Sequence, residues 1–596
     1  MSPGRADRIG FLLLALFAFG YVVARMLLVP PVHDEARLYL QWNLPGRYLP
    51  YLSHWDAGNH LLCTALGQLS ITLFGPALWA LRSFSALSFL LFACYTWRWG
   101  RWIVDRWSRW CFWSAMLLMP WVIGYFGLYR GYGMGLSFLL MALYHTVAAV
   151  QDGAKRHFFA AYTAWLLACA AMLPLTLLWC AALCSLLIAV FIRQRPNTHR
   201  AVLLAGWLLL GVLPLLGGLR YGHDLQERGL LYFGTDSGLV HGSLGSVTDC
   251  VLGRDPFWLL WPLVAAVAWA TSGGLRLIRP PWSATGPLAV LSVMVVAEVV
   301  GRLVLGWSGV LYPKARTAMH WMPLMVLLFA FAFDRVIANR PALRWGVAVL
   351  LCLPLRTLAT MQLDYATDWP EQAIGRDMLD QVRLRQAGAT RPLLIGASPA
   401  EQPQWDLARL LWDPTLPLLS GLGFPSAAND LLLIDPSYDE APAGFRTVAT
   451  NASGRLLLLE RNEPLRTVTV LDSIIPAASL RTSHTFWEPA VARWKGRELI
   501  VDVTFEVRSD ARCLTAAMVF DVVNTKDEHV PYDQVDLFTL RREWKADAVR
   551  ISRRLPVITD DIKRIVVYVW DINDQGIELG DVRIRIMEIP NGTAIR

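Results

Sequence analysis

The feature that most constrains this chain is a series of apolar runs, each about 20 residues long, that fills its first 361 residues. Because an α-helix rises about 1.5 Å per residue, a run of this length can cross the hydrocarbon core of a bilayer. The rule predicts about eleven spanning helices. They are expected near residues 9–29, 77–97, 110–127, 131–150, 157–172, 175–192, 201–218, 256–272, 284–305, 318–335 and 343–361.

The composition supports the same division. Only 17% of the residues are charged, whereas soluble domains carry about 25%. The apolar weight lies almost entirely before residue 362, and the remaining residues have the composition of ordinary soluble protein. We therefore expect a membrane domain over residues 1–361 followed by soluble domains.

The basic residues predict the orientation of the spans. The net charge is +8, but Lys and Arg gather in short segments between apolar runs, which encodes membrane topology and argues against a nucleic-acid partner. These segments fall on the side of Arg5 and Arg8, so the N-terminus is expected in the cytoplasm. The same pattern requires the apolar stretch 59–75 to lie at the membrane surface. With an odd number of spans, the residues after about 362 lie outside the cytoplasm.

Two soluble domains are predicted. Between residues 391 and 462, the apolar strands PLLIGA and DLLLID flank the helix-like WDLARLLW, which indicates a small α/β domain over residues 362–470. Beyond it the apolar alternation has a period of two, as in ELIVDVTFEV and IKRIVVYVWDI. This pattern predicts a β-sandwich of jelly-roll type over residues 471–596. The nine cysteines show no disulfide or zinc spacing.

Two adjacent carboxylates follow the first predicted span. Asp34 and Glu35 stand in the sequence HDEARLYL, at the outer edge of the membrane. Acids near hydrocarbon are costly and usually functional. They could equally cap the helix-like segment that follows, because acids are favourable in a first helical turn. The residues alone leave the two interpretations about even.

Four stretches of the sequence, in order, resemble motifs of the GT-C glycosyltransferases, a superfamily that includes protein mannosyltransferase-like and aminoarabinose-transferase-like enzymes. The first is HDEARLYL. The second, GNHLLCTALGQLSITLFGPALWALRSFSAL, matches the family pattern at Asn59, His60, Gly75 and Arg82, and departs from it at Gly58 and Cys63. The others are LYRGYGMGLSFLLMAL, with Tyr129 where a serine is usual, and LYPKARTAMHWMPL.

This resemblance implies a GT-C-like membrane enzyme that moves a sugar from a polyprenyl phosphate to an acceptor, with inversion at the anomeric carbon. An acceptor hydroxyl is a poor nucleophile, so a carboxylate must take its proton. Asp34 is the expected base and Glu35 the second choice. The leaving lipid phosphate needs fixed cations, for which Arg130, Lys314 and Arg316 are expected. Their alternative role is to contact lipid headgroups nonspecifically.

Further polar residues are candidates for contacts with the substrate. They are His60, His54, Tyr132, Arg82, Tyr221 and His223, the last two in a long external segment, 220–255, that could cover the donor site. A structural histidine is nearly as good a reading of His60. Adjacent acids and a histidine could hold Mg²⁺ or Mn²⁺, but D-x-D is absent from the sequence, so no required metal or other cofactor is expected.

The sandwich domain is rich in aromatic residues, namely Trp487, Trp494, Trp544, Tyr568 and Trp570. Aromatic faces stack on sugar rings, but core packing explains alternating aromatics as well and is the default.

The alternative to an enzyme is a polyprenyl-lipid transporter or a glycan-binding assembly scaffold. Transporters usually place charges near the midplane on broken helices and show internal symmetry, whereas the polar residues here concentrate in external loops. The resemblance favours a multi-pass protein of a bacterial inner membrane, with membrane lipid around it and its soluble domains in the periplasm. The acceptor could be a glycan, a lipid or a protein.

Overall fold

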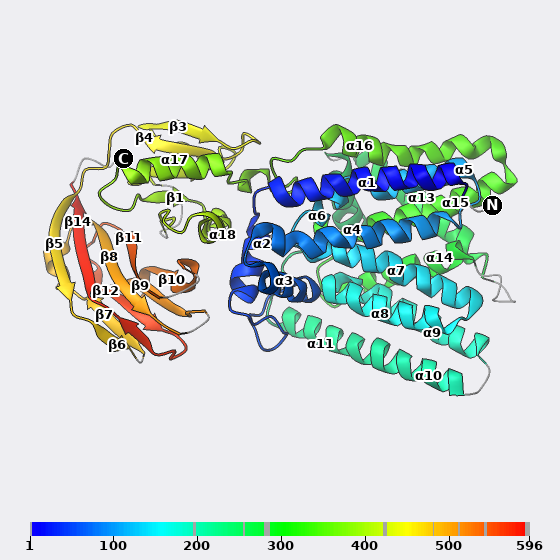
Figure 1. The fold of residues 1–596 in the computed structure, drawn as a ribbon, viewed down its shortest axis with the longest axis horizontal. Coiled ribbons are helices and arrows are strands. Elements are labelled where there is room, and N and C mark those ends of the chain that lie inside the picture. The colour runs from blue at the N-terminus through cyan, green and yellow to red at the C-terminus, as the bar shows by residue number, and fades with distance from the viewer. Residues whose placement is uncertain are drawn as a thin grey trace. The chain divides into compact units, whose positions relative to one another are not determined.

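The computed structural model describes residues 3–194, 198–253, 257–278, 286–420, 426–480, 482–510, 513–541 and 545–590. Trp544, one of the sandwich aromatics, lies outside these residues. The chain forms two compact units (Figure 1). The membrane unit contains Met1–Leu28 and Arg47–Leu363, and the second unit contains Val29–Gly46 and Asp364–Arg596. The HDEARLYL segment follows the first membrane helix in the sequence, but its contacts place it in the second unit.

The membrane unit is helical. Within the described residues, eight helices are long and apolar enough to cross a membrane. They are α1 (Arg5–Leu28), α4 (Leu78–Gly100), α7 (Gly131–Asp152), Leu173–Arg193 with α9 (Thr176–Arg193), Thr198–Glu227 with α10 (Thr198–Gly206) and α11 (Leu213–Glu227), α14 (Pro287–Trp307), Ala315–Asn339 with α15 (Trp321–Asn339), and Pro341–Thr360 with α16 (Cys352–Thr360). This chain is a multi-pass membrane protein.

The other three predicted spans coincide with shorter helices. Helix α8 (Lys155–Ala171) has 17 residues, and α13 (Phe257–Leu275) is described as an apolar helix from Leu259 onward. The predicted span 110–127 is interrupted. It divides into α5 (Arg106–Leu117) and α6 (Val122–Phe126), because Pro120 cannot donate a helical hydrogen bond and Trp121 adopts a positive φ of 64°.

The apolar stretch 59–75 forms helix α3 (Leu61–Phe74), which has only 14 residues. At about 1.5 Å per residue it is too short to cross a bilayer, as the sequence predicts. His60 is its N-cap and Gly75 its C-cap, and the Gly75 φ of 80° suits a residue without a Cβ atom. The helix packs against α4 and α8.

The α/β part of the second unit contains a four-stranded sheet of order β1-β2-β4-β3. Strands β1 (Ile395–Ala397) and β2 (Leu431–Ile434) pair in parallel, and α18 (Gln402–Trp412) lies between them in sequence. Strands β3 (Phe445–Thr450) and β4 (Leu457–Arg461) are antiparallel. Helix α17 (Arg376–Ala387) contacts β3. The two strands and the helix expected from the sequence are confirmed.

A two-sheet β-sandwich completes the second unit. One sheet has the order β10-β9-β12-β7 and the other β5-β14-β8-β13-β6, with β11 paired to β8. The strands are β5 (Val468–Ile475), β6 (Ala478–Leu480), β7 (Ser483–Trp487), β8 (Glu498–Arg508), β9 (Ala516–Asn524), β10 (His529–Asp536), β11 (Lys545–Leu555), β12 (Ile562–Asp571), β13 (Ile577–Leu579) and β14 (Val582–Ile589).

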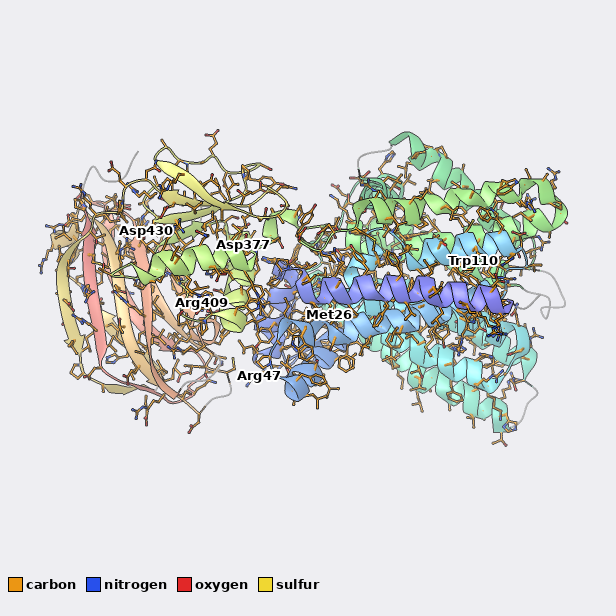
Figure 2. The ribbon with its side chains drawn as sticks, turned by 45° about the horizontal axis from the view of Figure 1, so that its top comes forward. Met26, Arg47, Trp110, Asp377, Arg409 and Asp430 are labelled. Atoms are coloured by element: carbon orange, nitrogen blue, oxygen red, sulfur yellow. The ribbon has the colours of Figure 1, made fainter. Side chains whose placement is uncertain are left out.

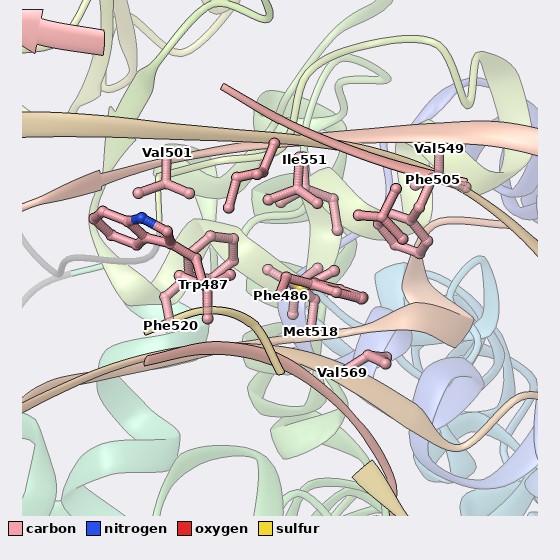
Figure 3. Close-up of a cluster of buried hydrophobic side chains, with 14 of the residues drawn as sticks. Phe486, Trp487, Val501, Phe505, Met518, Phe520, Val549, Ile551 and Val569 are labelled. Atoms are coloured by element: carbon pink, nitrogen blue, oxygen red, sulfur yellow. The ribbon is translucent and has the colours of Figure 1, made fainter. Parts of the chain in front are cut away.

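The core of the sandwich lies between the two sheets (Figure 3). Phe505 and Val501 of one sheet meet Phe520 and Val569 of the other, and all four are buried. Trp487 and Trp494 belong to this core with 8% and 2% of their surface exposed. The default reading of these two tryptophans as packing residues agrees with their burial.

Candidate functional site

Helix α2 (His33–Leu38) separates the two acids that the sequence leaves equivalent. Glu35 is fully buried, and its Oε2 accepts a hydrogen bond of 3.2 Å from the backbone N–H of Val32. It therefore performs the capping role. Asp34, one residue earlier, stays partly exposed. The geometry makes Asp34 the more accessible of the two carboxylates.

The start of α2 is fixed within the second unit. The backbone N–H of His33 donates to Gln372 Oε1 at 3.0 Å, and the His33 Nδ1 lies 2.8 Å from the carbonyl oxygen of Ala400. Since a carbonyl only accepts, this nitrogen carries the proton. Helix α18 packs on α2, and its Arg409, labelled in Figure 2, donates to the carbonyl oxygens of Leu416 and Pro414. Asp34 thus stands on an anchored helix.

In the membrane unit, residues of two motif stretches meet. His60 begins α3, and Arg130 precedes the first residue of α7. The rings of His60 and Tyr132 lie 4.8 Å apart edge to face, and the Arg130 guanidinium lies 5.7 Å from the centre of the Tyr132 ring. All three side chains are at most 7% exposed. We call these three residues the His60 cluster.

Gly131 allows the His60 cluster to form. A Cβ atom there would lie 2.2 Å from the carbonyl oxygen of Ala171 and 2.7 Å from the His60 Cβ. The His60 Nδ1 lies 2.8 Å from the same carbonyl oxygen. The glycines of the LYRGYGMG motif therefore serve close helix packing, as small residues do in membrane proteins.

Arg82 lies on α4, about one turn before Ser85. Its side chain is fully buried and donates from Nη1 to the carbonyl oxygen of Met26, a residue of α1 labelled in Figure 2, at 3.1 Å. Ser85, three residues later, donates to the carbonyl oxygen of Arg130 at 3.5 Å. The Arg82 position of the motif thus connects α1 and α4 beside the start of α7.

The LYPKART motif is hydrogen-bonded to residues of the segment between α11 and α13. Thr235 and Tyr312 form a β-bridge with both hydrogen bonds at 2.9 Å. Ser246 accepts a hydrogen bond of 2.9 Å from the backbone N–H of Ala315. Arg316 is half-buried with its guanidinium 4.0 Å from the centre of the Phe233 ring, whereas Lys314 is exposed. This segment covers the side chain of Arg316 and leaves that of Lys314 open.

Tyr221 belongs to an aromatic cluster with the loop that follows α2 in the sequence. Its ring stacks 5.5 Å from that of Trp55, and Tyr51 meets both rings edge to face. The Tyr51 hydroxyl donates to Asp224 at 2.9 Å, and burial together with this carboxylate raises the pKa of Tyr51. His223 is exposed and lies 3.2 Å from Glu227, and His54 is exposed.

Sequence reasoning missed a buried ionic triad. Glu298 of α14 lies 2.8 Å from the Arg302 Nε and 2.9 Å from the His320 Nε2, and no member is more than 8% exposed. Arg302 also donates to the carbonyl oxygen of Pro174 at 2.6 Å. A lone acid inside the apolar run 284–305 was the available signal, because ionisable residues inside membranes are usually functional.

The triad and the His60 cluster hold the same turn. Ala171, at the end of α8, lies against His60, and Pro174, three residues later, accepts the hydrogen bond from Arg302. His320 lies within the LYPKARTAMHWMPL stretch and is linked to Arg302 through Glu298. Contacts within the membrane unit therefore connect three of the four motif stretches through the turn at residues 171–175. The approach of Asp34 to these cations remains a prediction. Across the described residues, no three His, Cys, Asp or Glu side chains are grouped as a metal site.

No model of a known family matches the sequence, and the search of curated proteins finds no match. Among solved structures, the chain is similar to ArnT from Cupriavidus metallidurans bound to undecaprenyl phosphate, with 14% identity, a TM-score of 0.43 and coverage of 77% of this chain and 98% of that one. It is similar to the oligosaccharyltransferase AglB from Archaeoglobus fulgidus in complex with an inhibitory peptide and a dolichol-phosphate, with 11% identity, a TM-score of 0.39 and coverage of 96% and 97%.

A third similar structure is the arabinosyltransferase EmbB from Mycobacterium smegmatis, with 14% identity and a TM-score of 0.32. The match covers 97% of this chain but spans only 64% of the EmbB chain. At these identities and TM-scores the similarity assigns neither a family nor a substrate to this chain, so the function is argued below from the residues.

Proposed function

We propose that this chain is a GT-C glycosyltransferase that moves a sugar from a polyprenyl phosphate to an acceptor, on the outer face of a bacterial inner membrane. The observation that carries the proposal lies within the membrane unit. Residues of the second and third motif stretches meet at the turn 171–175, and the fourth stretch is connected to that turn through His320, Glu298 and Arg302. Arg130 lies immediately before the first residue of α7 in the His60 cluster, and a guanidinium at such a position can bind the phosphate of a lipid-linked sugar.

The proposed reaction is an inverting displacement at the anomeric carbon. Asp34 removes the proton from the acceptor hydroxyl as its oxygen bonds to the anomeric carbon. The bond from that carbon to the phosphate oxygen breaks, and polyprenyl phosphate leaves. Asp34 is preferred to Glu35 as the base, because Glu35 is buried and caps α2.

The leaving phosphate is proposed to be stabilised by Arg130, Lys314 and Arg316. Arginine presents a planar fork that can donate two parallel hydrogen bonds to phosphate, and lysine presents a point charge. Lys314 is exposed and Arg316 half-buried, so both can reach a lipid headgroup. His60, Tyr132 and Arg82 position the helices around this site, while Tyr221, His223 and His54 are proposed to contact the sugar or the acceptor. The reaction as proposed needs no metal.

A polyprenyl-lipid transporter is the second candidate, favoured by the Glu298 triad, because transporters carry ionisable groups between membrane helices. The test is the release of free polyprenyl phosphate from a panel of radiolabelled polyprenyl-phosphate sugars by the purified protein, with crude envelope glycan, lipid and protein as acceptors. The enzyme releases it with at least one donor. Movement of the intact donor across a vesicle membrane, without release, would establish the transporter instead.

A further inference from the structure

The outward face of the sheet β10-β9-β12-β7 carries aromatic and polar side chains that have no role in the proposed reaction. Along β9, Met518, Phe520 and Val522 point into the sandwich core, so the residues between them point away from it. The strand register places the outward residues in three rows. These rows are Tyr532, Asp521 and Val566; Gln534, Val519 and Tyr568; and Asp536, Ala517 and Trp570.

The outward side chains of the central strand β9 are short, whereas those of the flanking strands β10 and β12 include large aromatic rings. The central strand β9 contributes the short Ala517 and Val519, which are fully buried. The flanking strands contribute Tyr532 and Trp570, which are 43% and 39% exposed, and the half-buried Tyr568. Since neighbouring strands lie about 4.8 Å apart, the two flanking strands are about 10 Å apart. The face therefore presents aromatic rings to the outside, and the short side chains of β9 lie covered beneath their neighbours.

Hydrogen-bonding groups alternate with these rings. His529 Nδ1 lies 2.7 Å from Asp521, the Tyr532 hydroxyl donates to Gln534 at 3.4 Å, and Gln534 donates to Asp536 at 2.5 Å. Burial, and next the neighbouring Tyr532, raise the pKa of Tyr568 to about 12, which places these two tyrosines close to each other across β9. Hydrogen-bond donors and acceptors therefore lie on the same and neighbouring strands as the aromatic rings.

This chemistry selects among classes of partner. The nine residues of the three rows include two carboxylates, and Arg564 of β12 acts electrostatically on Tyr568. Two carboxylates beside one Arg disfavour phosphate-rich ligands such as nucleic acids. Each ring adjoins a polar side chain, whereas a lipid or an apolar helix needs a continuous apolar patch. A sugar ring has an apolar C–H face that stacks on an aromatic ring and hydroxyl groups at its edge. Both parts are matched here.

We propose that this outward face, centred on Tyr532, Tyr568 and Trp570, binds a neutral oligosaccharide, and that this glycan is the acceptor of the transferase. The assignment of the glycan as acceptor rests on the proposed function, whereas the binding does not. The face deepens that proposal by selecting a glycan among the glycan, lipid and protein acceptors that the sequence leaves open.

The test uses the full chain in lipid nanodiscs and four probes, the linear hexasaccharides of glucose, mannose, galactose and arabinose. Binding is measured by saturation-transfer NMR and by titration of intrinsic fluorescence. At least one probe is expected to bind. Trp570→Ala and Tyr532→Ala should each weaken that binding about tenfold, because each removes a stacking ring. Tyr438→Ala is the matched control, since Tyr438 is 82% exposed in the same unit outside the sandwich and should bind as the wild type does.

Circular dichroism and size-exclusion profiles of both variants establish that they are folded, and Tyr532 lies on the edge strand β10, where truncation is tolerated best. Failure of all four probes to bind, or wild-type affinity in both variants, overturns the proposal. Release of polyprenyl phosphate is measured separately with donor alone and with glycan. Glycan binding that depends on Trp570 in a protein that never releases polyprenyl phosphate would refute the enzyme while leaving the glycan site in place.

Discussion

Replacing Glu298 by Gln tests whether the buried triad stabilises the membrane unit. Glu298 Oε1 accepts from Arg302 at 2.8 Å and lies 2.9 Å from His320, in surroundings where Glu298 itself has no exposed surface. Removing one partner of a buried ion pair costs about 3 to 5 kcal/mol. The amide oxygen of Gln can still accept one hydrogen bond, and Arg302 keeps its bond to Pro174. We therefore expect a loss near the lower end, about 3 kcal/mol.

The assay is thermal unfolding of the purified protein in detergent, followed by tryptophan fluorescence. A loss of about 3 kcal/mol lowers the Tm by roughly 4 °C if the membrane unit, Met1–Leu28 with Arg47–Leu363, unfolds as one. Glu227→Gln is the matched control, because Glu227 also pairs with a residue four positions away, His223, but both side chains are more than half exposed. An exposed pair contributes about 0 to 1 kcal/mol, so the control should shift the Tm by less than about 1.5 °C.

A double-mutant cycle refines this test. If Glu298 and Arg302 stabilise the protein through each other, Glu298→Gln combined with Arg302→Met should cost less than the sum of the single changes, by at least about 1 kcal/mol. Equal Tm values for Glu298→Gln and Glu227→Gln, or strictly additive effects in the cycle, would refute the reasoning.

Two further predictions follow from other parts of the chain. Gly131→Ala should destabilise the protein by about 1 to 3 kcal/mol in thermal unfolding and weaken donor binding, because its Cβ would press on Ala171 and His60. Gly217→Ala is the control, because the space around Gly217 is open, and equal effects of the two variants would contradict the packing argument. Burial raises the pKa of Glu401 from 4.5 to about 7, so the folded state binds more protons than the unfolded state between these pH values. Stability of the second unit should therefore fall as the pH rises from about 4.5 to 7, by up to about 3 kcal/mol, and Glu401→Gln should flatten this dependence in Tm measurements from pH 4.5 to 8; an unchanged slope would contradict the assignment to Glu401.

The sequence predicts those parts of the fold whose physical cause is local. Apolar runs long enough for a bilayer predict α1, α4, α7 and α14, and period-two alternation predicts the sandwich strands. The predicted span 110–127 contains Pro120, which is a local signal for the break between α5 and α6, but counting apolar residues alone does not register it. The membership of Val29–Gly46 in the second unit depends on packing against α18, which no local pattern encodes.

The candidate site divides in the same way. The acids of α2 can be found from the sequence, but only the hydrogen bond from Val32 to Glu35 distinguishes the capping residue from Asp34. Glu298 stands out as a charge in an apolar run, yet its partner His320 is 22 residues away. Such pairings depend on which helices become neighbours, and no local pattern in the sequence shows this.

The most direct test of the proposed function is the rate of polyprenyl phosphate release by Asp34→Asn, beside Glu35→Gln and the wild type, with donor binding measured on the same preparations. Loss of the base should lower the rate at least about 100-fold while donor affinity is retained, and Glu35→Gln should keep the greater part of the activity because its carboxylate caps α2. Wild-type turnover in a folded Asp34→Asn variant would contradict the account.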